Sequence, residues 1–458
     1  MGRYSVGVSL SWLLSLSLLC SCVLSPSAAL ADGEGDTVSN ITGEWTALLE
    51  QQWAVDTHGH RQKLETRIQP KWVGSVSDSM ELTAIGRLRL DAYDRISPSA
   101  HTPENNSEIS MPWYNSAHAE FQLREFFIDA EFLNGFWRVG KQQIVWGQAD
   151  GIKLLDVVNP QSYREFILEE YEDSRIPLWS VNYEVEISDD ASLQLLWIPD
   201  LTFNELAEPD KTFAFTAPEI IPRASTGLGV RVLSTDKPDN GLSDGEWGVK
   251  YSLFAGGWDL TLNYLYHYQD NPVLYQTLVG VTPADLSVEV TPTYERNHLV
   301  GGTASNAIGD FTVRSEIGYN SDTYHVASDL NTHGIQQSDE LAFVFGLDYQ
   351  GLSDVMLSAQ WFQSHLLDYD RSMERRQTKN SVTFLYRHNF LNETWELEVL
   401  DIHAIESDDG VVQAKLSHML ESNLELWLGL DVFYGNNEGV FGQFDHNDRW
   451  VFGVEWGL

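Results

Sequence analysis

Apolar and polar residues alternate along many stretches of this chain. Segments 61–73, 80–94 and 423–433 place apolar side chains at every second position, with mostly polar or charged side chains between them. A period of two is the pattern of a β-strand with one apolar face. Strands in soluble sandwiches usually hold about five or six residues, whereas a tilted strand that crosses a bilayer needs about nine to eleven. These segments are therefore long enough to cross a membrane.

The same pattern recurs over the rest of the chain. We predict strands at 44–55, 61–73, 80–94, 118–133, 136–146, 177–188, 191–199, 245–254, 257–269, 294–305, 310–320, 339–350, 355–367, 379–389, 393–403, 410–420, 423–433 and 448–458. At one end of these strands the connections are short, as at 134–135 and 189–190. At the other end they include the long segments 95–117, 147–176, 200–244, 270–293, 321–338 and 434–447.

Short periplasmic turns at one end and long extracellular loops at the other are typical of an outer-membrane barrel. The predicted fold class is all-β: a transmembrane antiparallel up-and-down β-barrel of about 18 strands, or 16 if one hairpin is miscounted. The alternative is a secreted all-β protein, such as a propeller or a β-helix. The asymmetry of the connections favours the barrel.

The two ends of the chain fit export to the outer membrane of a Gram-negative cell. Residues 1–31 form a predicted signal peptide, with Arg3, an apolar run and a small-residue cleavage site ending at Ala31. A lipoprotein signal with Cys22 as the lipidated residue is the alternative. We assign 32–43 to a periplasmic N-terminal segment and 44–458 to the barrel.

The last strand carries its own signal. Residues 448–458 alternate through Trp450, Phe452, Val454 and Trp456 to Leu458. This ending resembles the terminal signal that barrel-assembly machinery reads, although Leu458 stands where a Phe is more usual. Many chains end near an aromatic residue by chance, but fewer do so on an alternating strand of this length.

Composition narrows the class of partner. The formal net charge of −39 argues against nucleic acid. The chain holds 16 Trp, 18 Tyr and 20 Phe, and such an aromatic-rich exported chain can lie in a membrane if its strands close into a barrel. Outer-membrane lipids and lipopolysaccharide are then the expected surroundings.

One strand carries a resemblance to a known family. Arg138-Val139-Gly140-Lys141-Gln142, followed by Trp146-Gly147, resembles the R-x-G-R/K-Q-x-x-x-W-G strand of an uncharacterised family of proteobacterial outer-membrane barrels related to the alginate-export porins. The likeness extends through 156–160 and 173–177. The resemblance implies a monomeric barrel and supplies no substrate. Some relatives are thought to work beside an inner-membrane exporter, which would suit an exit duct.

Charged residues on the strands are expected to face the lumen, because one on the lipid face costs about 2–4 kcal/mol at the midplane. Ten basic and four acidic candidates result: Lys63, Glu65, Arg67, Lys71, Arg87, Arg89, Asp91, Arg138, Arg314, Glu316, Arg387, Lys415, Arg449 and Glu455. Arg67, Arg87, Arg89 and Arg138 come from neighbouring strands and could form a positive patch that favours anions. Cross-strand ion pairing is the simpler interpretation of such a mixed set, and we favour it.

The connection 147–176 is the candidate constriction. Asn159 and Pro160 predict a helix start, with Tyr163, Phe166, Ile167 and Tyr171 on one face of the helix. That apolar face favours folding into the barrel mouth. In that position the charged residues Arg164, Glu165, Asp173 and Arg175 would face the solute. The alternative is a cap outside the barrel against 200–244.

No hydrolase elbow, H-E-x-x-H sequence, P-loop or paired-cysteine site is present in the sequence. The acidic stretch 236–246 lacks the spacing of an EF-hand. We therefore expect no cofactor and no metal, and predict a porin-like channel that passes a solute or an exported product. The alternatives are an outer-membrane enzyme acting on lipid or lipopolysaccharide at the rim, and a non-conducting scaffold or adhesin.

Overall fold

The computed structural model describes residues 42–93, 95–96, 105–149, 151–223, 228–280, 282 and 285–458. The predicted signal peptide, the lipoprotein alternative at Cys22 and nearly all of the predicted segment 32–43 lie outside these described residues. Ile41–Leu458 forms one compact unit. Among the described residues, no helix is long and apolar enough to cross a membrane.

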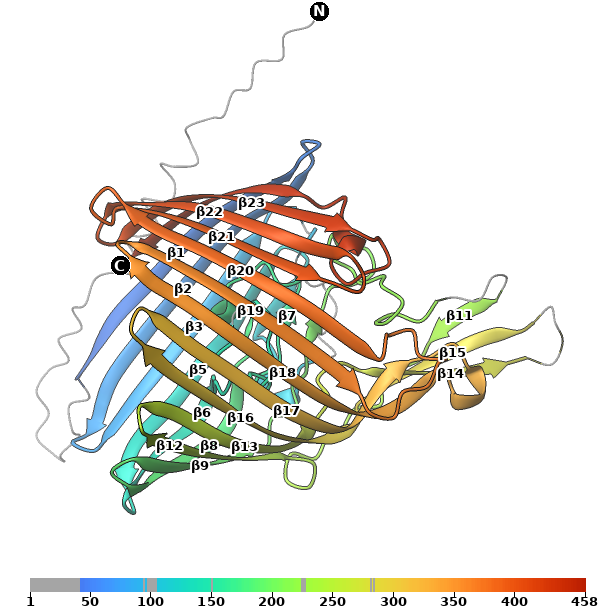
Figure 1. Cartoon of the computed structure of the whole chain (residues 1–458), viewed down its shortest axis with the longest axis horizontal. Helices are drawn as coiled ribbons and strands as arrows, with labels where there is room; N and C mark the ends of the chain where they lie inside the picture. Colours follow the sequence, from blue (N-terminus) through green and yellow to red (C-terminus); the bar gives the residue numbers. More distant parts are fainter. Residues whose placement is uncertain are drawn as a thin grey trace, which may run out of the picture. The chain divides into compact units, whose positions relative to one another are not determined.

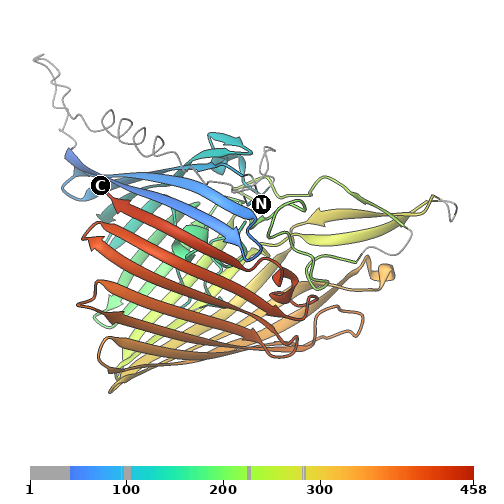
Figure 2. The ribbon, with the colours of Figure 1, turned by 90° about the horizontal axis from the view of Figure 1, so that it is seen from above.

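In the part of the chain that the structure describes, eighteen antiparallel strands form a closed barrel (Figures 1 and 2). They are β1 (Thr42–Asp56), β2 (Arg61–Ser77), β3 (Met80–Asp91), β5 (Ala119–Phe132), β6 (Gly135–Gln142), β8 (Leu178–Ser188), β9 (Ala191–Ile198), β12 (Glu246–Ala255), β13 (Trp258–Tyr268), β16 (Arg296–Ile308), β17 (Phe311–Val326), β18 (Ile335–Leu352), β19 (Val355–Leu366), β20 (Thr378–Phe390), β21 (Trp395–Ala404), β22 (Asp409–Glu421), β23 (Leu424–Gly435) and β24 (Arg449–Gly457). Each strand pairs with the next in this series, and β1 pairs with β24 to close the wall. The predicted fold class is confirmed.

Alternation along each strand separates the two faces of the wall. In β18, Leu341, Phe345 and Leu347 are exposed on the outer face, whereas Ala342, Val344 and Asp348, which alternate with them, are buried. An apolar outer face and a polar inner face are what a barrel needs in a bilayer.

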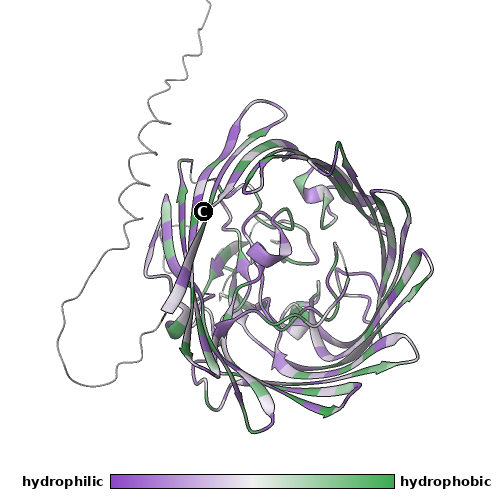
Figure 3. Cartoon of the chain, turned by 90° about the vertical axis from the view of Figure 1, so that its left-hand side faces the viewer, coloured by the Kyte–Doolittle hydropathy of each residue, from purple (hydrophilic) through white to green (hydrophobic). Residues whose placement is uncertain are grey.

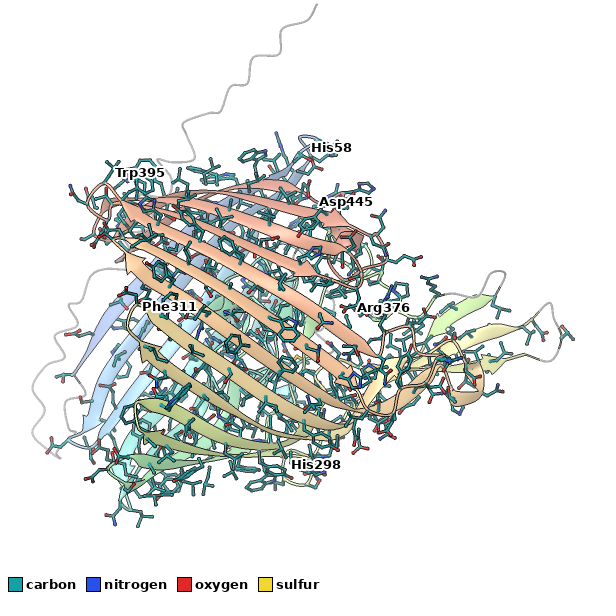
Figure 4. All side chains as sticks on the ribbon, in the orientation of Figure 1. His58, His298, Phe311, Arg376, Trp395 and Asp445 are labelled. Carbon is teal, nitrogen blue, oxygen red and sulfur yellow. The ribbon has the colours of Figure 1, made fainter. Side chains whose placement is uncertain are left out.

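Aromatic rings gather on the wall beside the short turns. Phe311 packs on Tyr349 with 4.8 Å between ring centroids, and Phe132 packs on Trp137 at the same distance. Phe311 and Trp395 lie at the end of the barrel opposite Arg376 (Figure 4). A girdle of this kind is typical of the membrane interface of such barrels.

Several short elements lie outside the wall. β11 (Gly229–Val232), β14 (Val273–Val279) and β15 (Ser287–Thr293) form a separate sheet that projects beyond the barrel mouth (Figure 1). β4 (Tyr114–Ser116) pairs with the N-terminal end of β5. The remaining short elements are η1 (Glu108–Ser110), β7 (Ser162–Tyr163), α2 (Tyr171–Ser174), β10 (Glu205–Leu206), η2 (Leu330–Thr332) and η3 (Gly442–Phe444).

Candidate functional site

Strand β6 ends at Gln142, four residues earlier than predicted, and the chain then turns into the barrel. Gly140 has φ +140°, and a Cβ there would collide with the Phe126 carbonyl oxygen of β5. Past this point Trp146 is buried, and its Nε1 donates to Gln194 Oε1 at 2.8 Å on the inner face of β9. Figure 3 shows connecting segments inside the ring of strands. We call residues 147–176 the lumen segment.

The base of the lumen segment is closed by Asn159. Its Oδ1 accepts from the Ile144 N–H at 2.6 Å, and its Nδ2 donates to the Ile176 carbonyl at 2.8 Å. Beside it the Arg175 guanidinium donates to Asp156 Oδ2 at 2.7 and 2.9 Å, with both side chains buried. The two arms of the segment are thereby joined where it leaves the wall.

The helix predicted to start at Asn159 and Pro160 is wrong. Ser162–Tyr163 forms the short strand β7, which pairs in parallel with β10. Phe166 has φ +55°, which no helix accommodates, and the only α-helix among the described residues is α2. The backbone pairs with the 200–244 connection and so has a partner other than its own preceding turn.

The tip of the lumen segment ends in a buried charge cluster on the β2 and β24 side of the wall. Arg164 donates to Glu65 of β2 at 2.7 and 3.0 Å and to Glu169 at 3.0 Å. Glu165 accepts from Arg449 of β24 at 2.7 Å and also pairs with Lys63 of β2. Arg164 and Glu165 are each 1% exposed, so they do not face the solute as predicted. Each makes its bonds within the cluster.

The start of the lumen segment contacts the wall at β17. Glu316 of β17 accepts from the backbone N–H groups of Gln148 and Leu155, the latter at 3.2 Å. Arg314 of β17 donates to the Gln148 carbonyl at 2.5 Å and pairs with Asp348 of β18 at 2.9 Å. In strand order β17 lies far from β2 and β24 around the ring. The lumen segment therefore spans the lumen between two parts of the wall.

The end of the lumen segment lies against β2, β3 and β5. The Asp173 carboxylate pairs with Arg67 of β2 at 2.6 Å. The Asp173 carbonyl accepts from Arg87 of β3 at 3.4 Å and from Arg124 of β5 at 3.2 Å. Arg89 of β3 donates to Glu169 at 3.4 Å. The structure thus brings Arg67, Arg87 and Arg89 to one stretch of the lumen segment.

Arg138 lies apart from that group. It makes a bidentate pair with Asp129 of β5 at 2.7 and 2.8 Å, and its guanidinium lies 4.2 Å from the Phe127 ring centroid. Two buried cations of the wall strands were not predicted from the sequence, Arg124 of β5 and Lys141 of β6. The only sequence signal for Lys141 was its place in the R-x-G-K-Q strand.

Electrostatics keep the carboxylates of the tip ionised. Burial alone would raise the pKa of Glu165, but Lys63, Arg449 and Arg164 outweigh it and hold that pKa below its ordinary value. Burial opposes ionisation of Glu169 as well, and the nearby cations, Arg164 first, keep its pKa well below the usual range. The ion pairs of the tip are therefore intact at neutral pH.

An aromatic cluster covers the tip from the side of the long loops. Phe166 packs on Phe444 at 4.9 Å and on Phe441 at 5.7 Å between ring centroids. Phe213 and Phe433 complete the cluster with Phe444. The connections 147–176, 200–244 and 434–447 therefore meet in one apolar core over the charge cluster. Among the residues that the structure describes, no three His, Cys, Asp or Glu are grouped so that they could hold a metal ion.

A closed antiparallel barrel with an apolar exterior, an aromatic girdle and loop segments inside defines the class: this is an outer-membrane β-barrel of the porin type. The chain belongs to a family described as "Protein of unknown function (DUF1302)", which matches residues 86–421. No curated protein matches the sequence.

Two solved structures share the fold. The chain is similar to the outer membrane protein OpdK from Pseudomonas aeruginosa, with 10% identity, a TM-score of 0.51, and coverage of 91% of this chain and 99% of that one. It is also similar to Pseudomonas aeruginosa OccK8 (OprE), with 10% identity, a TM-score of 0.51, and coverage of 91% and 98%. At such identity the likeness concerns the fold alone.

Proposed function

We propose that the protein is an outer-membrane channel whose lumen is narrowed by the lumen segment. The observation that carries this proposal is the attachment of that segment to two separate parts of the wall: Glu165 at its tip bonds to Arg449 of β24, and the Leu155 N–H nearer its start bonds to Glu316 of β17. A segment held between two separate parts of the wall sets the cross-section of the lumen that is left for a solute.

The cost of the charge cluster supports a role in passage. Burying ions costs several kcal/mol each unless every one is paired. A barrel that only anchored a surface protein could fill its lumen with neutral side chains. Here Glu65, Arg164 and Glu165 combine charges from the wall and from the segment, which holds the segment in its position.

The direction of passage is a finer part of the proposal. The R-x-G-K-Q strand with Trp146 and Gly147 resembles that of the alginate-export porins, and this resemblance favours outward movement of a product delivered by an inner-membrane exporter. We further propose that the channel works as a monomer, and that the barrel-assembly machinery inserts it through strand β24.

Conductance across planar lipid bilayers tests the proposal. The purified wild-type protein should insert with stepwise current increases in potassium chloride. A variant in which a short Gly-Ser connection replaces residues 148–175 should give steps several-fold larger, because the obstruction is gone. The matched control shortens the β14–β15 hairpin, which lies in a separate sheet outside the wall, and should leave the step size unchanged.

Two results would refute the channel. One is a lack of steps in both the wild type and the variant without the lumen segment, although both migrate as folded barrels in unheated electrophoresis samples. The other is turnover of phospholipid or lipopolysaccharide by the same preparation without any conductance, which would favour a rim enzyme.

A further inference from the structure

Three buried cations of the inner wall differ from the others in having no carboxylate within hydrogen-bonding distance among the described residues. Arg87, Arg124 and Lys141 are 4%, 4% and 3% exposed. Among the described residues, no carboxylate oxygen lies within hydrogen-bonding distance of any of them; the nearest is Glu120 Oε1, 4.0 Å from Arg87. By contrast, Arg164 and Arg449 each bond directly to carboxylates. The three therefore form a separate set.

The three residues lie on adjacent strands. Arg87 is on β3 and pairs with Gln122 of β5, Arg124 stands at a β-bulge of β5, and Lys141 is on β6 opposite Phe126 of β5. Gln122 and Phe126 lie two residues before and two residues after Arg124 on β5, so the three cations occupy neighbouring positions on adjacent strands. Their charges therefore converge on one region of the inner wall.

These cations make few hydrogen bonds, and some of their N–H groups have no acceptor among the described residues. Arg124 donates to the backbone carbonyls of Glu172 and Asp173 at 2.6 and 3.2 Å. Arg87 makes one long bond to the Asp173 carbonyl, and its buried Nε has no hydrogen-bond partner. The Lys141 ammonium makes no hydrogen bond or ion pair with any residue that the structure describes. Buried donors without an acceptor are costly.

The carboxylates nearby are engaged elsewhere. Asp173 binds Arg67. Asp200 accepts from Thr202 Oγ1 at 2.7 Å, from Ser110 Oγ at 2.5 Å and from the Trp179 N–H at 3.0 Å. Glu120 accepts from Gln122 at 2.6 Å. Among the described residues, none of these three carboxylates accepts a hydrogen bond from Arg87, Arg124 or Lys141, and Glu120 reaches Arg87 only at 4.0 Å.

We propose that Arg87, Arg124 and Lys141 form an oxyanion-binding site on the inner wall, beside the end of the lumen segment. Its ligand is the carboxylate or phosphate group of a solute. Arginine forks suit the two oxygens of such a group, and a lysine adds a point charge. The site deepens the proposed channel function, on which it rests, by naming the class of solute.

Titration calorimetry on the detergent-solubilised wild-type protein tests the site, with sodium phosphate and sodium acetate as probes and sodium chloride at equal ionic strength as the reference. We expect saturable binding of at least one oxyanion. Whether phosphate or acetate binds identifies the ligand group as a phosphate or a carboxylate. Lys141→Gln and Arg124→Gln should each weaken binding about tenfold or more, because each removes a charge-assisted hydrogen bond. Lys141→Arg should restore most of it.

The control is Lys250→Gln. Lys250 of β12 directly follows Val249, which is exposed on the outer face, so Lys250 points to the lumen. β12 pairs with β9 and β13 and not with the strands that carry the site. A merely structural role for Lys141 predicts a lower melting temperature in Lys141→Gln without oxyanion. The proposed site predicts no loss, because an unpaired buried charge is removed.

Binding of neither oxyanion, or equal affinity in the wild type and in Lys141→Gln, overturns the site. Conductance recorded on the same samples in potassium chloride separates the two proposals. A conducting protein without oxyanion binding refutes the site alone, whereas a binding protein without conductance refutes the channel alone.

Discussion

Glu165 of the lumen segment accepts a 2.7 Å hydrogen bond from Arg449, a residue 284 positions later in the chain. Both side chains are almost wholly buried. This pair joins the segment that enters the barrel early in the chain to the last strand of the wall. Closure of the ring and positioning of the segment are therefore linked through one contact.

Glu165→Gln should release the tip of the lumen segment. Lys63 and Arg449 would remain buried beside a neutral side chain, and breaking a buried pair in this way costs about 3–5 kcal/mol. The expected results are faster proteolysis within 147–176 and larger, noisier conductance steps, with the wall still folded.

The matched control for that substitution is Glu170→Gln. Glu170 is 73% exposed and pairs with Lys415 at 3.3 Å, so its loss should change stability by about 1 kcal/mol or less. Equal protease resistance of both variants would contradict the role assigned to the tip.

Acid should have the same effect as loss of the ion pairs. The pKa values of Glu165 and Glu169 are lower in the folded protein than the ordinary 4.5. Such groups contribute stability above the unfolded pKa, and this contribution is lost as pH falls through the folded value. Conductance and protease resistance should therefore be constant from neutral pH down to about 4.5 and change only in stronger acid. A change centred near pH 6 would point to other groups.

Gly140→Ala should hinder folding at the point where the chain leaves the wall. Gly140 combines φ +140° with close approach to the Phe126 carbonyl, and strain of this kind costs about 1–3 kcal/mol. We expect a lower refolding yield, measured by the mobility of unheated samples in electrophoresis. Gly86→Ala on β3 is the control, because its nearest neighbour would be Pro70 at 3.6 Å and its φ is ordinary. Similar yields for both variants would refute the argument.

Asn159→Ala should open the base of the lumen segment. It leaves the Ile144 N–H and the Ile176 carbonyl without this partner, at about 1–3 kcal/mol for each buried group. Asn423→Ala, at an exposed turn where Nδ2 donates to the Gly457 carbonyl at 2.8 Å, should cost much less. Chemical denaturation followed by tryptophan fluorescence compares the two, and equal midpoints would count against a special role for Asn159.

The strands of the wall could be predicted from the sequence because the alternation and length that define them lie in each strand's own residues. A strand between lipid and water must alternate, and a bilayer sets its length, so segments such as 80–94 and 423–433 carry both signals in their own residues. The same logic indicated which strand charges face inward, among them Arg67, Arg87 and Arg89.

Contacts between residues far apart in the sequence could not be predicted from alternation. The helix predicted from Asn159 gave way to pairing with β10, because a backbone partner from another loop was available. Alternation continued from Phe126 and Ile128 would point Arg124 and Lys141 at the lipid. A β-bulge opposite Ile85 and Gly86 and the left-handed turn at Gly140 accompany their inward burial instead.

The chain by itself thus determined a membrane barrel, its strands and the connection 147–176 as the candidate constriction. Only the tertiary structure decided that Arg164 and Glu165 hold this segment to the wall, while Arg87, Arg124 and Lys141 have no carboxylate within hydrogen-bonding distance among the described residues. The physical reason is that periodicity reports how each residue faces lipid or lumen, whereas ion pairing depends on which residues of far-separated segments share the interior.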